Sequence, residues 1–355
     1  MDELRYGVIG TGMMGIEHIE NINAVVGGRV TAIADTHPES RDAGAAAAAN
    51  AVDVFADHRA LLESDSCDAL VVATPNMTHI DILRDVMATD LPVLVEKPLC
   101  TTVDECREVI ELADGRAGLV WVGLEYRYMP PVARLIDELR TGVIGAARMV
   151  AIREHRFPFL VKVGDWNRFR ENTGGTLVEK CCHFFDLMNV LIGATPVSVF
   201  ASGAQDVNHL DEVYDGRRPD ILDNAFVIVD YDNGSRALLD LCMFADATQN
   251  QEEISVVGER GKLEALLPES IVRVGIRGEH WIGDVADQPV VDETIGFHGH
   301  HHGSSYVEHT KFIDAVMNGK GAEVTLHDGL VSVAMGQAAH RSIDEARPVQ
   351  LAELL

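Results

Sequence analysis

The chain has 355 residues, of which 47% are hydrophobic, and this is enough to build two domains with buried cores. Its formal net charge of −27 argues against nucleic acid or an anionic membrane as a partner, and the scarcity of lysine, 6 against 23 arginines, suits either a salty cytoplasm or a GC-rich genome. No apolar run reaches the length of a membrane span, and the acidic start lacks the basic region of a signal peptide, so we expect a soluble cytoplasmic protein. The six cysteines show no metal-type spacing, so we expect reduced thiols.

A short apolar strand, YGVI, opens the chain and runs directly into a glycine-rich turn and a helical pattern. Gly10 permits the tight turn, Gly12 lets the backbone approach a pyrophosphate, and Gly15 allows close packing of helix on strand. The backbone N–H groups around Met13 and Met14, where the helix begins, are then available to bind the phosphates. The stretch predicts a dinucleotide-binding unit.

A second strand, residues 30–35, ends in Asp35, twenty positions after Gly15. A carboxylate at this point accepts hydrogen bonds from the ribose hydroxyls of adenosine and repels a 2′-phosphate. The residues that follow, THP, include no arginine that would bind such a phosphate. We therefore predict NAD as the cofactor, with NADP disfavoured.

Further short apolar runs alternate with helical segments up to residue 125, which predicts a doubly wound parallel sheet. The runs are residues 52–57, 67–75, 92–99 and 118–124. Ligands of such sheets bind at the carboxyl ends of the strands. The polar residues at two of these ends are therefore expected to contact the cofactor: Thr74, Pro75, Asn76 and His79 at one, and Glu96 and Lys97 at the other.

The pattern changes after residue 125, where strands joined by short turns replace the alternation of strands and helices. The strand candidates are residues 146–157, 197–204, 224–245, 252–267 and 270–276, with a hairpin signal at DNG. We predict an α/β protein with a Rossmann domain at 1–125 and an α+β domain at 126–355, whose mainly antiparallel open sheet has one face covered by helices. The other face could pair subunits in a homodimer or homotetramer. A last helix, within 328–351, could pack back on the first domain.

Residues 174–187, GGTLVEKCCHFFDL, form an apolar stretch that Glu179, Lys180 and His183 interrupt. In a single helix covering 174–192, the period of 3.6 residues places Glu179, His183 and Asp186 on one face. This arrangement is typical of the wall of a site. The alternative is a histidine whose hydrogen bonds are satisfied within the core.

These motifs together resemble the Gfo/Idh/MocA family, which includes glucose–fructose oxidoreductase and inositol dehydrogenase. The resemblance covers nearly the whole chain and rests on GTGMMG, ATPNMTHIDI, VEKPL, RTGVIG, GGTLVEKCCHFFDL and DGLVSVAMGQAAHRSI. It implies an NAD(P)-dependent dehydrogenase acting on a sugar, inositol or related polyol. It also implies that Lys97 contacts the cofactor and the substrate hydroxyl, and that His183 faces it across a cleft as the general base. Glu179 matches the acidic position four residues earlier, where the family often has Asp.

Three candidates for substrate contact lie outside these motifs. Trp166 and Arg168 stand in an aromatic and arginine-rich stretch, where they could stack on and hydrogen-bond a sugar, or else anchor a loop to the core. Arg127 follows the last strand of the first domain and could face the cleft.

A histidine-rich stretch, FHGHHHGSSYVEH, precedes a helix that starts near Ser305. Histidine clusters can bind zinc or nickel, but no spaced set of Cys or carboxylates accompanies this one, and the family's chemistry needs no metal. We therefore predict no metal site. The stretch is either a loop over the substrate cleft, with His302 as a substrate contact, or an ordinary polar loop.

The leading functional hypothesis is an NAD-dependent dehydrogenase that oxidises a secondary hydroxyl of a polyol or sugar. A second is the cleavage of glycosides through transient oxidation by tightly held NAD. A third is a non-catalytic regulator that binds a dinucleotide, although such a protein would not need both Lys97 and His183.

Overall fold

The computed structural model describes residues 3–355, which form two compact units. The first unit reaches Glu125 and includes Lys162–Trp166 and Glu293–Val333, whereas the second comprises Tyr126–Val161, Asn167–Asp292 and Ala334–Leu355. The boundary after Glu125 lies where the sequence pattern changes. The two later segments of the first unit come from the part of the chain that was assigned by sequence to the second domain. No helix within residues 3–355 is both long and apolar enough to cross a membrane.

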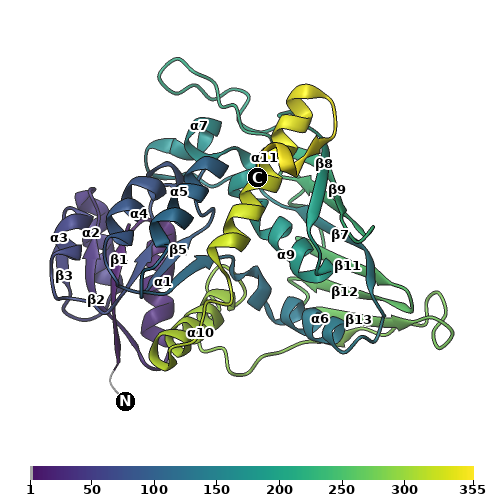
Figure 1. The fold of residues 1–355 in the computed structure, drawn as a ribbon, viewed down its shortest axis with the longest axis horizontal. Coiled ribbons are helices and arrows are strands. Elements are labelled where there is room, and N and C mark those ends of the chain that lie inside the picture. The colour runs from purple at the N-terminus through teal and green to yellow at the C-terminus, as the bar shows by residue number, and fades with distance from the viewer. Residues whose placement is uncertain (1–2) are drawn as a thin grey trace. The chain divides into compact units, whose positions relative to one another are not determined.

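The first unit contains a six-stranded sheet in which every pair of strands is parallel (Figure 1). The strands are β1 (Leu4–Ile9), β2 (Gly28–Ala34), β3 (Asp53–Phe55), β4 (Ala69–Val72), β5 (Val93–Glu96) and β6 (Val120–Gly123). Their spatial order, β3-β2-β1-β4-β5-β6, reverses direction between β1 and β4. This confirms the doubly wound Rossmann sheet, and the reversal marks the point where dinucleotides bind in such sheets.

Helices connect these strands, so β4 and β5 are buried along their whole length and read as continuous apolar runs. The helices are α1 (Met13–Ala24), α2 (Pro38–Ala47), α3 (His58–Leu62), η1 (Asn76–Thr78), α4 (His79–Met87) and α5 (Val103–Ala113). A later helix, α10 (Ser304–Asn318), belongs to the same unit because its Phe312 packs on the rings of Tyr6 in β1 and Trp121 in β6.

The second unit contains a nine-stranded sheet in the order β14-β13-β12-β11-β7-β10-β9-β8-β15. The strands are β7 (Ala147–His155), β8 (Pro196–Ala204), β9 (Asn224–Tyr231), β10 (Arg236–Cys242), β11 (Glu252–Gly258), β12 (Gly261–Leu267), β13 (Ile271–Ile276), β14 (Gln288–Pro289) and β15 (Val349–Gln350). Only the β7–β10 pair is parallel. The prediction of a mainly antiparallel sheet is confirmed, as is the hairpin, whose turn contains Gly234 with a positive φ of 80°.

Strand β9 alternates strictly between buried and exposed residues, as expected for a sheet with one covered face. Helices α6 (Pro130–Arg140) and α9 (Cys182–Ile192) pack on the covered face. The remaining short helices of this part of the chain are η2 (Glu125–Tyr128), η3 (Val163–Arg168), α7 (Arg170–Thr173), α8 (Thr176–Glu179) and η4 (Leu351–Glu353).

The final helix, α11 (Leu326–Glu345), begins in the first unit and continues into the second. Near the start of the helix, Gly329 packs so closely on Leu99 of the same unit that a Cβ at this glycine would lie 3.0 Å from the Leu99 Cβ. Further along, a Cβ at Gly336 would lie 2.5 Å from the Leu177 oxygen in α8. Two glycines therefore permit the close packing of this helix.

The prediction of one helix over residues 174–192 is wrong, because the segment divides into α8 and α9. The Cys181 N–H bonds to the Thr176 oxygen five residues back, and the Phe184 N–H bonds to Cys181 only three residues back. These bonds locally widen and then tighten the helix, a distortion that is frequent at functional sites. Glu179 therefore ends one helix, and His183 and Asp186 lie on the next.

Candidate functional site

The glycine-rich turn between β1 and α1 has the geometry that its sequence predicts. Gly10 has a φ of +89°, and a Cβ at Gly15 would lie only 1.9 Å from the Gly10 oxygen. A Cβ at Gly12, in contrast, would meet no atom within 4 Å, so the backbone there is open to a ligand. Helix α1 has no acidic residue in its first turn, so the positive end of its dipole is left for an anionic group.

Asp35 follows directly on β2 and is held by two backbone N–H groups. The Thr11 N–H donates to its Oδ2 and the His37 N–H to its Oδ1, both at 2.8 Å. Arg41, on α2, donates from Nη1 to the backbone oxygen of Asp35 at 2.7 Å. The carboxylate is thus oriented from two sides, and Arg41 beside it is bound to the backbone oxygen of Asp35.

We expect the protein to use NAD at least about tenfold more efficiently than NADP, a difference of about 1.4 kcal/mol. Asp35→Ser should raise kcat/KM for NADP by roughly tenfold or more, because it removes the negative charge while Arg41 stays bound to the backbone oxygen. Steady-state kinetics with both cofactors measure the change. Adding Arg41→Ala to Asp35→Ser should leave the gain in place, and equal efficiency of the wild type with the two cofactors would contradict the role of Asp35.

The residues after β4 provide a polar group that suits a bound cofactor. Asn76 is buried, and its side-chain Nδ2 has no hydrogen-bond partner within residues 3–355, so this amide donor is left for a ligand. His79 is fully buried, and its ring nitrogens lie 2.9 Å from the Pro98 oxygen and 3.1 Å from the Thr74 oxygen. Burial lowers the pKa of His79, so a neutral ring braces the loops after β4 and β5.

The carboxylate of Glu96, at the end of β5, is bound from both sides. Its Oε2 accepts from the Lys97 N–H at 2.9 Å, and its Oε1 lies 2.9 Å from Nε2 of His18 in α1. Burial would raise the pKa of Glu96, but the His18 hydrogen bond and the charges of His18 and Lys97 outweigh it and lower the pKa to about 2. His18 in turn lies 2.9 Å from His309 of α10. This buried network fixes the backbone from which the half-buried Lys97 side chain extends.

The histidine-rich stretch is anchored to α1 through the buried Glu17. The His300 N–H donates to Glu17 Oε1 at 3.0 Å, and Nδ1 of His301 lies 3.2 Å from the same oxygen. His302 is partly buried, which lowers its pKa. Within residues 3–355 no group of three or more His, Cys, Asp and Glu side chains could hold a metal ion. The stretch therefore packs within the first unit, and the substrate contact by His302 stays a prediction.

In the second unit, the two candidate catalytic residues of α8 and α9 are both buried. Glu179 is 6% exposed and His183 is 2% exposed. The imidazole of His183 stacks on the ring of Tyr126, with ring centroids 3.9 Å apart and planes 5° from parallel. A buried imidazole with a fixed plane can serve as a general base if substrate reaches it, so burial alone does not decide between a base and a core histidine.

Two of the predicted substrate contacts have ionic partners inside the second unit. Arg127 binds the buried Asp186 through two bonds, from Nη2 to Oδ1 and from Nε to Oδ2, the latter 2.6 Å long. Arg168 is 2% exposed, and its Nε donates to Glu212 at 3.0 Å. Their pairings position α9 and the loop that follows β8, and contact with substrate stays a prediction for both. Trp166 lies half-buried in a segment of the first unit.

His340, on α11, is a site-building residue that sequence reasoning missed. Its Nε2 accepts from the Leu177 N–H at 3.1 Å and so satisfies a free donor of the first turn of α8. Burial lowers the pKa of His340 to about 3, which keeps the ring neutral and able to accept. A Cβ at Gly175 would lie 2.3 Å from this ring, which explains the second glycine of the motif. The glycine pair in the sequence indicates that another group packs closely against this turn, but it does not identify that group as His340.

Lys180 was noticed as an interruption of the apolar stretch, but its surroundings were not predicted. Its ammonium is buried with Glu154 of β7 and bonds to the Tyr126 hydroxyl. Glu154 and Glu252 occupy inward positions of alternating strands, where an apolar residue is expected. Two acidic residues at inward-facing strand positions could have indicated a buried cation nearby, because a buried carboxylate needs a partner of opposite charge.

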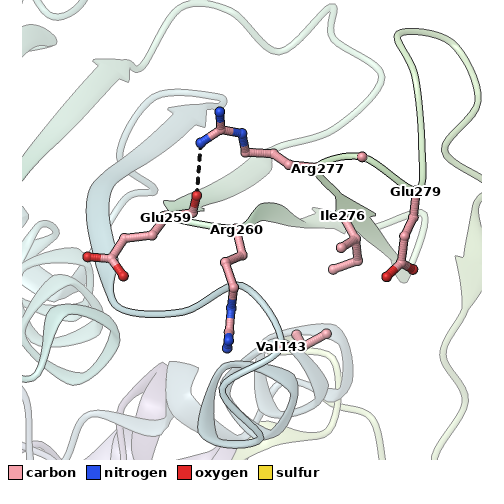
Figure 2. Close-up of a pocket in the computed structure, with 7 residues that line it drawn as sticks. Val143, Glu259, Arg260, Ile276, Arg277 and Glu279 are labelled. Carbon is pink, nitrogen blue, oxygen red and sulfur yellow. Dashed lines mark hydrogen bonds between the residues drawn. The ribbon is translucent and has the colours of Figure 1, made fainter.

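A surface depression of about 760 Å³ in the second unit contains none of the predicted site residues (Figure 2). It is lined by Val143, Glu259, Arg260, Ile276, Arg277, Gly278 and Glu279. Arg277 donates to the Glu259 backbone oxygen at 3.0 Å, and Arg260 donates to the Gly142 oxygen. Both guanidinium groups thus hold the ends of β12 and β13 in place, and we assign the depression no role in binding.

The fold and these groups define a protein of two compact units, the first of which is a dinucleotide-binding Rossmann fold. The chain belongs to the Gfo/Idh/MocA family of oxidoreductases, because the family's NAD-binding Rossmann model matches residues 4–124 and its C-terminal alpha/beta model matches residues 136–351.

Named relatives of the chain match it over almost its full length. It is 30% identical to inositol 2-dehydrogenase 2 of Saccharopolyspora erythraea, over 98% of this chain and 96% of the relative. It is 26% identical to a myo-inositol 2-dehydrogenase of Thermotoga maritima, over 99% and 100%. Among solved structures, an Agrobacterium radiobacter oxidoreductase in complex with NAD+, L-tartaric acid and magnesium has a TM-score of 0.85 at 17% identity, over 99% and 100% of the two chains. That likeness shows the shared fold.

Proposed function

We propose that the protein is an NAD-dependent dehydrogenase that oxidises a secondary hydroxyl of an inositol, a sugar or a related polyol. The observation that carries the proposal is the presence of both Lys97 after β5 and His183 on α9 in a chain with a complete dinucleotide turn. The full-length similarity to an inositol 2-dehydrogenase supports inositol as the first substrate to test. We propose that the reaction takes place in the cytoplasm, because all six cysteines are free thiols, which a reducing compartment maintains.

The residues of this chain bind the cofactor and manage the proton and charge of the substrate. The α1 N-terminus binds the pyrophosphate, Asp35 the adenosine ribose, and Asn76 donates its side-chain amide. Bound NAD would supply the nicotinamide C4 as hydride acceptor. His183 accepts the hydroxyl proton on a ring nitrogen, because a neutral imidazole is a base suited to neutral pH. The Lys97 ammonium donates a hydrogen bond to the substrate oxygen as negative charge develops there.

Glu179 has a supporting role in this proposal. Its buried carboxylate can bind a second substrate hydroxyl or hold the imidazole, and neither task moves the reacting proton. We propose that its loss affects substrate binding more than proton transfer.

A panel of inositols, aldoses and glycosides with NAD, followed at the NADH absorbance, tests the function. We expect NADH to accumulate with at least one inositol or sugar, and the Lys97→Met/His183→Ala double variant to be the inactive control. Release of an aglycone without NADH accumulation, by protein that retains NAD after dialysis, would favour glycoside cleavage instead. NADH binding without turnover of any compound would favour the regulator.

We also propose that the protein forms a homodimer or homotetramer through the uncovered face of the second sheet. The apolar face, as we name it, consists of Met149, Phe200, Phe226, Ile228, Leu238 and Val257, which lie on five neighbouring strands. Phe226 is 60% and Met149 is 53% exposed. Ile228 lies opposite both Phe200 and Leu238 in register, so the exposed side chains are contiguous. Contiguous exposed apolar surface of this kind supports contact with another subunit.

Ile228→Glu should convert the oligomer to monomers, because it places a charge in the middle of the apolar face. Light scattering coupled to size-exclusion chromatography measures the mass. Val54→Glu, which changes a half-exposed residue of β3 in the first unit, is the matched control and should leave the mass unchanged. A wild-type protein that elutes as a monomer would contradict the proposed assembly.

A further inference from the structure

Three ionisable side chains form a buried cluster in the second unit. Glu154 on β7 lies directly opposite Glu252 on β11, and both point to the covered face of the sheet. The Lys180 ammonium, between α8 and α9, lies 3.0 Å from Glu154 Oε1. Glu154 is 0% and Glu252 2% exposed, while the Lys180 side chain is 5% exposed. Arg156, at 3.6 Å from Glu154, is the other cation beside the pair.

The protonation states of this ionic cluster follow from its burial. Desolvation and the adjacent negative charge of Glu154 together raise the pKa of Glu252 to about 8, so Glu252 is mostly protonated at neutral pH. Desolvation also lowers the pKa of Lys180, although the charge of Glu154 opposes this. Glu154 therefore faces the Lys180 ammonium at 3.0 Å, and the mostly protonated Glu252 lies opposite Glu154 on the neighbouring strand.

A buried cluster of this kind is weak evidence for a gain in stability. Removing charges from water costs several kcal/mol per ion, and well-packed apolar residues in place of a buried ion pair are often equally or more stabilising. The ionic cluster provides a hydrogen-bond donor at a fixed position, which apolar side chains would not provide. This donor is the Lys180 ammonium, which donates to the Tyr126 hydroxyl at 2.7 Å.

Tyr126 transmits this fixed position to His183. Its ring lies 3.9 Å from the imidazole of His183 and parallel to it within 5°, and an edge contact with Phe184 supports it at 5.8 Å. The Lys180 ammonium lies 4.9 Å from the centroid of the Tyr126 ring. The stack sets the plane of the imidazole, and the bond to the hydroxyl prevents the supporting ring from sliding or turning.

We propose that Tyr126 and Lys180 are positioning residues for His183: the Tyr126 ring is the surface on which the imidazole lies, and Lys180, anchored by Glu154, holds that ring by its hydroxyl. The inference rests on the proposed function, in which His183 is the base. Displacement of a reacting group by about 1 Å can lower the rate about 10²-fold. By holding the plane of the His183 imidazole, the Tyr126 ring therefore contributes to turnover without touching substrate.

Two variants test the proposal, and in both of them Arg156 keeps its hydrogen bond to the Phe157 oxygen. Tyr126→Phe keeps the stacked ring and removes the hydroxyl. The Lys180→Met/Glu154→Gln double variant replaces the ion pair by neutral side chains of similar size. The matched control is Tyr231→Phe, because the hydroxyl of this buried tyrosine bonds to Asn189, a residue of the same helix as His183, at 2.9 Å.

We expect kcat to fall roughly threefold in Tyr126→Phe and roughly tenfold or more in the double variant, with KM changed less than about twofold. The thermal midpoint of the double variant should stay equal to that of the wild type or rise. The loss of kcat could then not be attributed to a loss of folding stability. Tyr231→Phe should keep its kcat. If Tyr231→Phe loses as much kcat as Tyr126→Phe, or if the double variant keeps full kcat, the proposal is overturned.

A second readout needs neither substrate nor cofactor. In protein with ¹³C-labelled histidine, the signal of His183 is identified by its absence in His183→Gln and is displaced by the ring current of Tyr126. The double variant should move or broaden this signal, whereas Tyr231→Phe should leave it in place. A signal in the double variant that coincides with the wild type overturns the positioning. A signal that moves in a protein that oxidises no compound of the panel supports the positioning and rejects the dehydrogenase proposal.

Discussion

His183→Ala should lower kcat by roughly 10² to 10⁴ while NADH still binds with its wild-type affinity. The reason is that removal of the imidazole leaves no group in its place to accept the hydroxyl proton as hydride leaves. Single-turnover hydride transfer at saturating NAD measures the step, and fluorescence titration measures NADH binding. His183→Gln, which keeps a polar side chain of similar size but is no base, should lose nearly as much.

The control for lost packing is Met188→Ala. Met188 is fully buried on the same helix, and its truncation should cost about 2 to 5 kcal/mol of folding stability, with kcat of the folded protein changed by less than about twofold. Glu179→Gln should retain more activity than His183→Ala, with much of its loss in KM. Fast hydride transfer in His183→Ala would refute the base, and the histidine would then be a core residue stacked on Tyr126.

Lys97→Met should lower kcat by roughly 10² to 10³, because the oxygen that gains negative charge loses its positively charged donor. The methionine keeps the length of the side chain, and the Lys97 N–H still donates to Glu96, so the turn after β5 should be unchanged. Single-turnover transfer and NADH titration separate a lost catalytic interaction from a lost cofactor contact.

Lys311→Met is the matched control for Lys97→Met. Lys311 lies on α10 in the same unit and pairs with Glu323 at the surface, so the substitution removes one ammonium group without touching the turn. It should leave kcat within about twofold of the wild type. A Lys97→Met variant with wild-type hydride transfer and weakened NADH binding would limit Lys97 to cofactor binding.

The Rossmann unit and its cofactor residues could be predicted from the sequence because the signals are local. Gly10, Gly12 and Gly15 have their conformations dictated by a single strand–turn–helix, and Asp35 ends the next strand. The apolar runs of β4 and β5 follow from burial on both faces. The antiparallel second sheet was likewise predicted from local signals, namely strands joined by short turns and a hairpin signal at DNG.

Prediction was less complete where backbone distortion or distant partners decide the arrangement. A helix-period argument placed Glu179 and His183 on one helix, but a shift in hydrogen bonding at Cys181 separates α8 from α9. Arg127 was expected to face a cleft, and its bond to Asp186 is invisible to any pattern along the chain.

The sequence alone thus determined the fold class and the dinucleotide turn, since their signals come from residues a few positions apart, and it singled out His183 as an ionisable residue in an apolar stretch. Only the tertiary structure decided what surrounds that histidine. Tyr126, Lys180 and Glu154 come from a turn after β6, a helix junction and a strand, and strand register brings Glu252 opposite Glu154. A buried charge needs a partner of opposite charge or a hydrogen-bond partner nearby in space. Tertiary packing decides which residue this is, and that residue can be far away in the sequence.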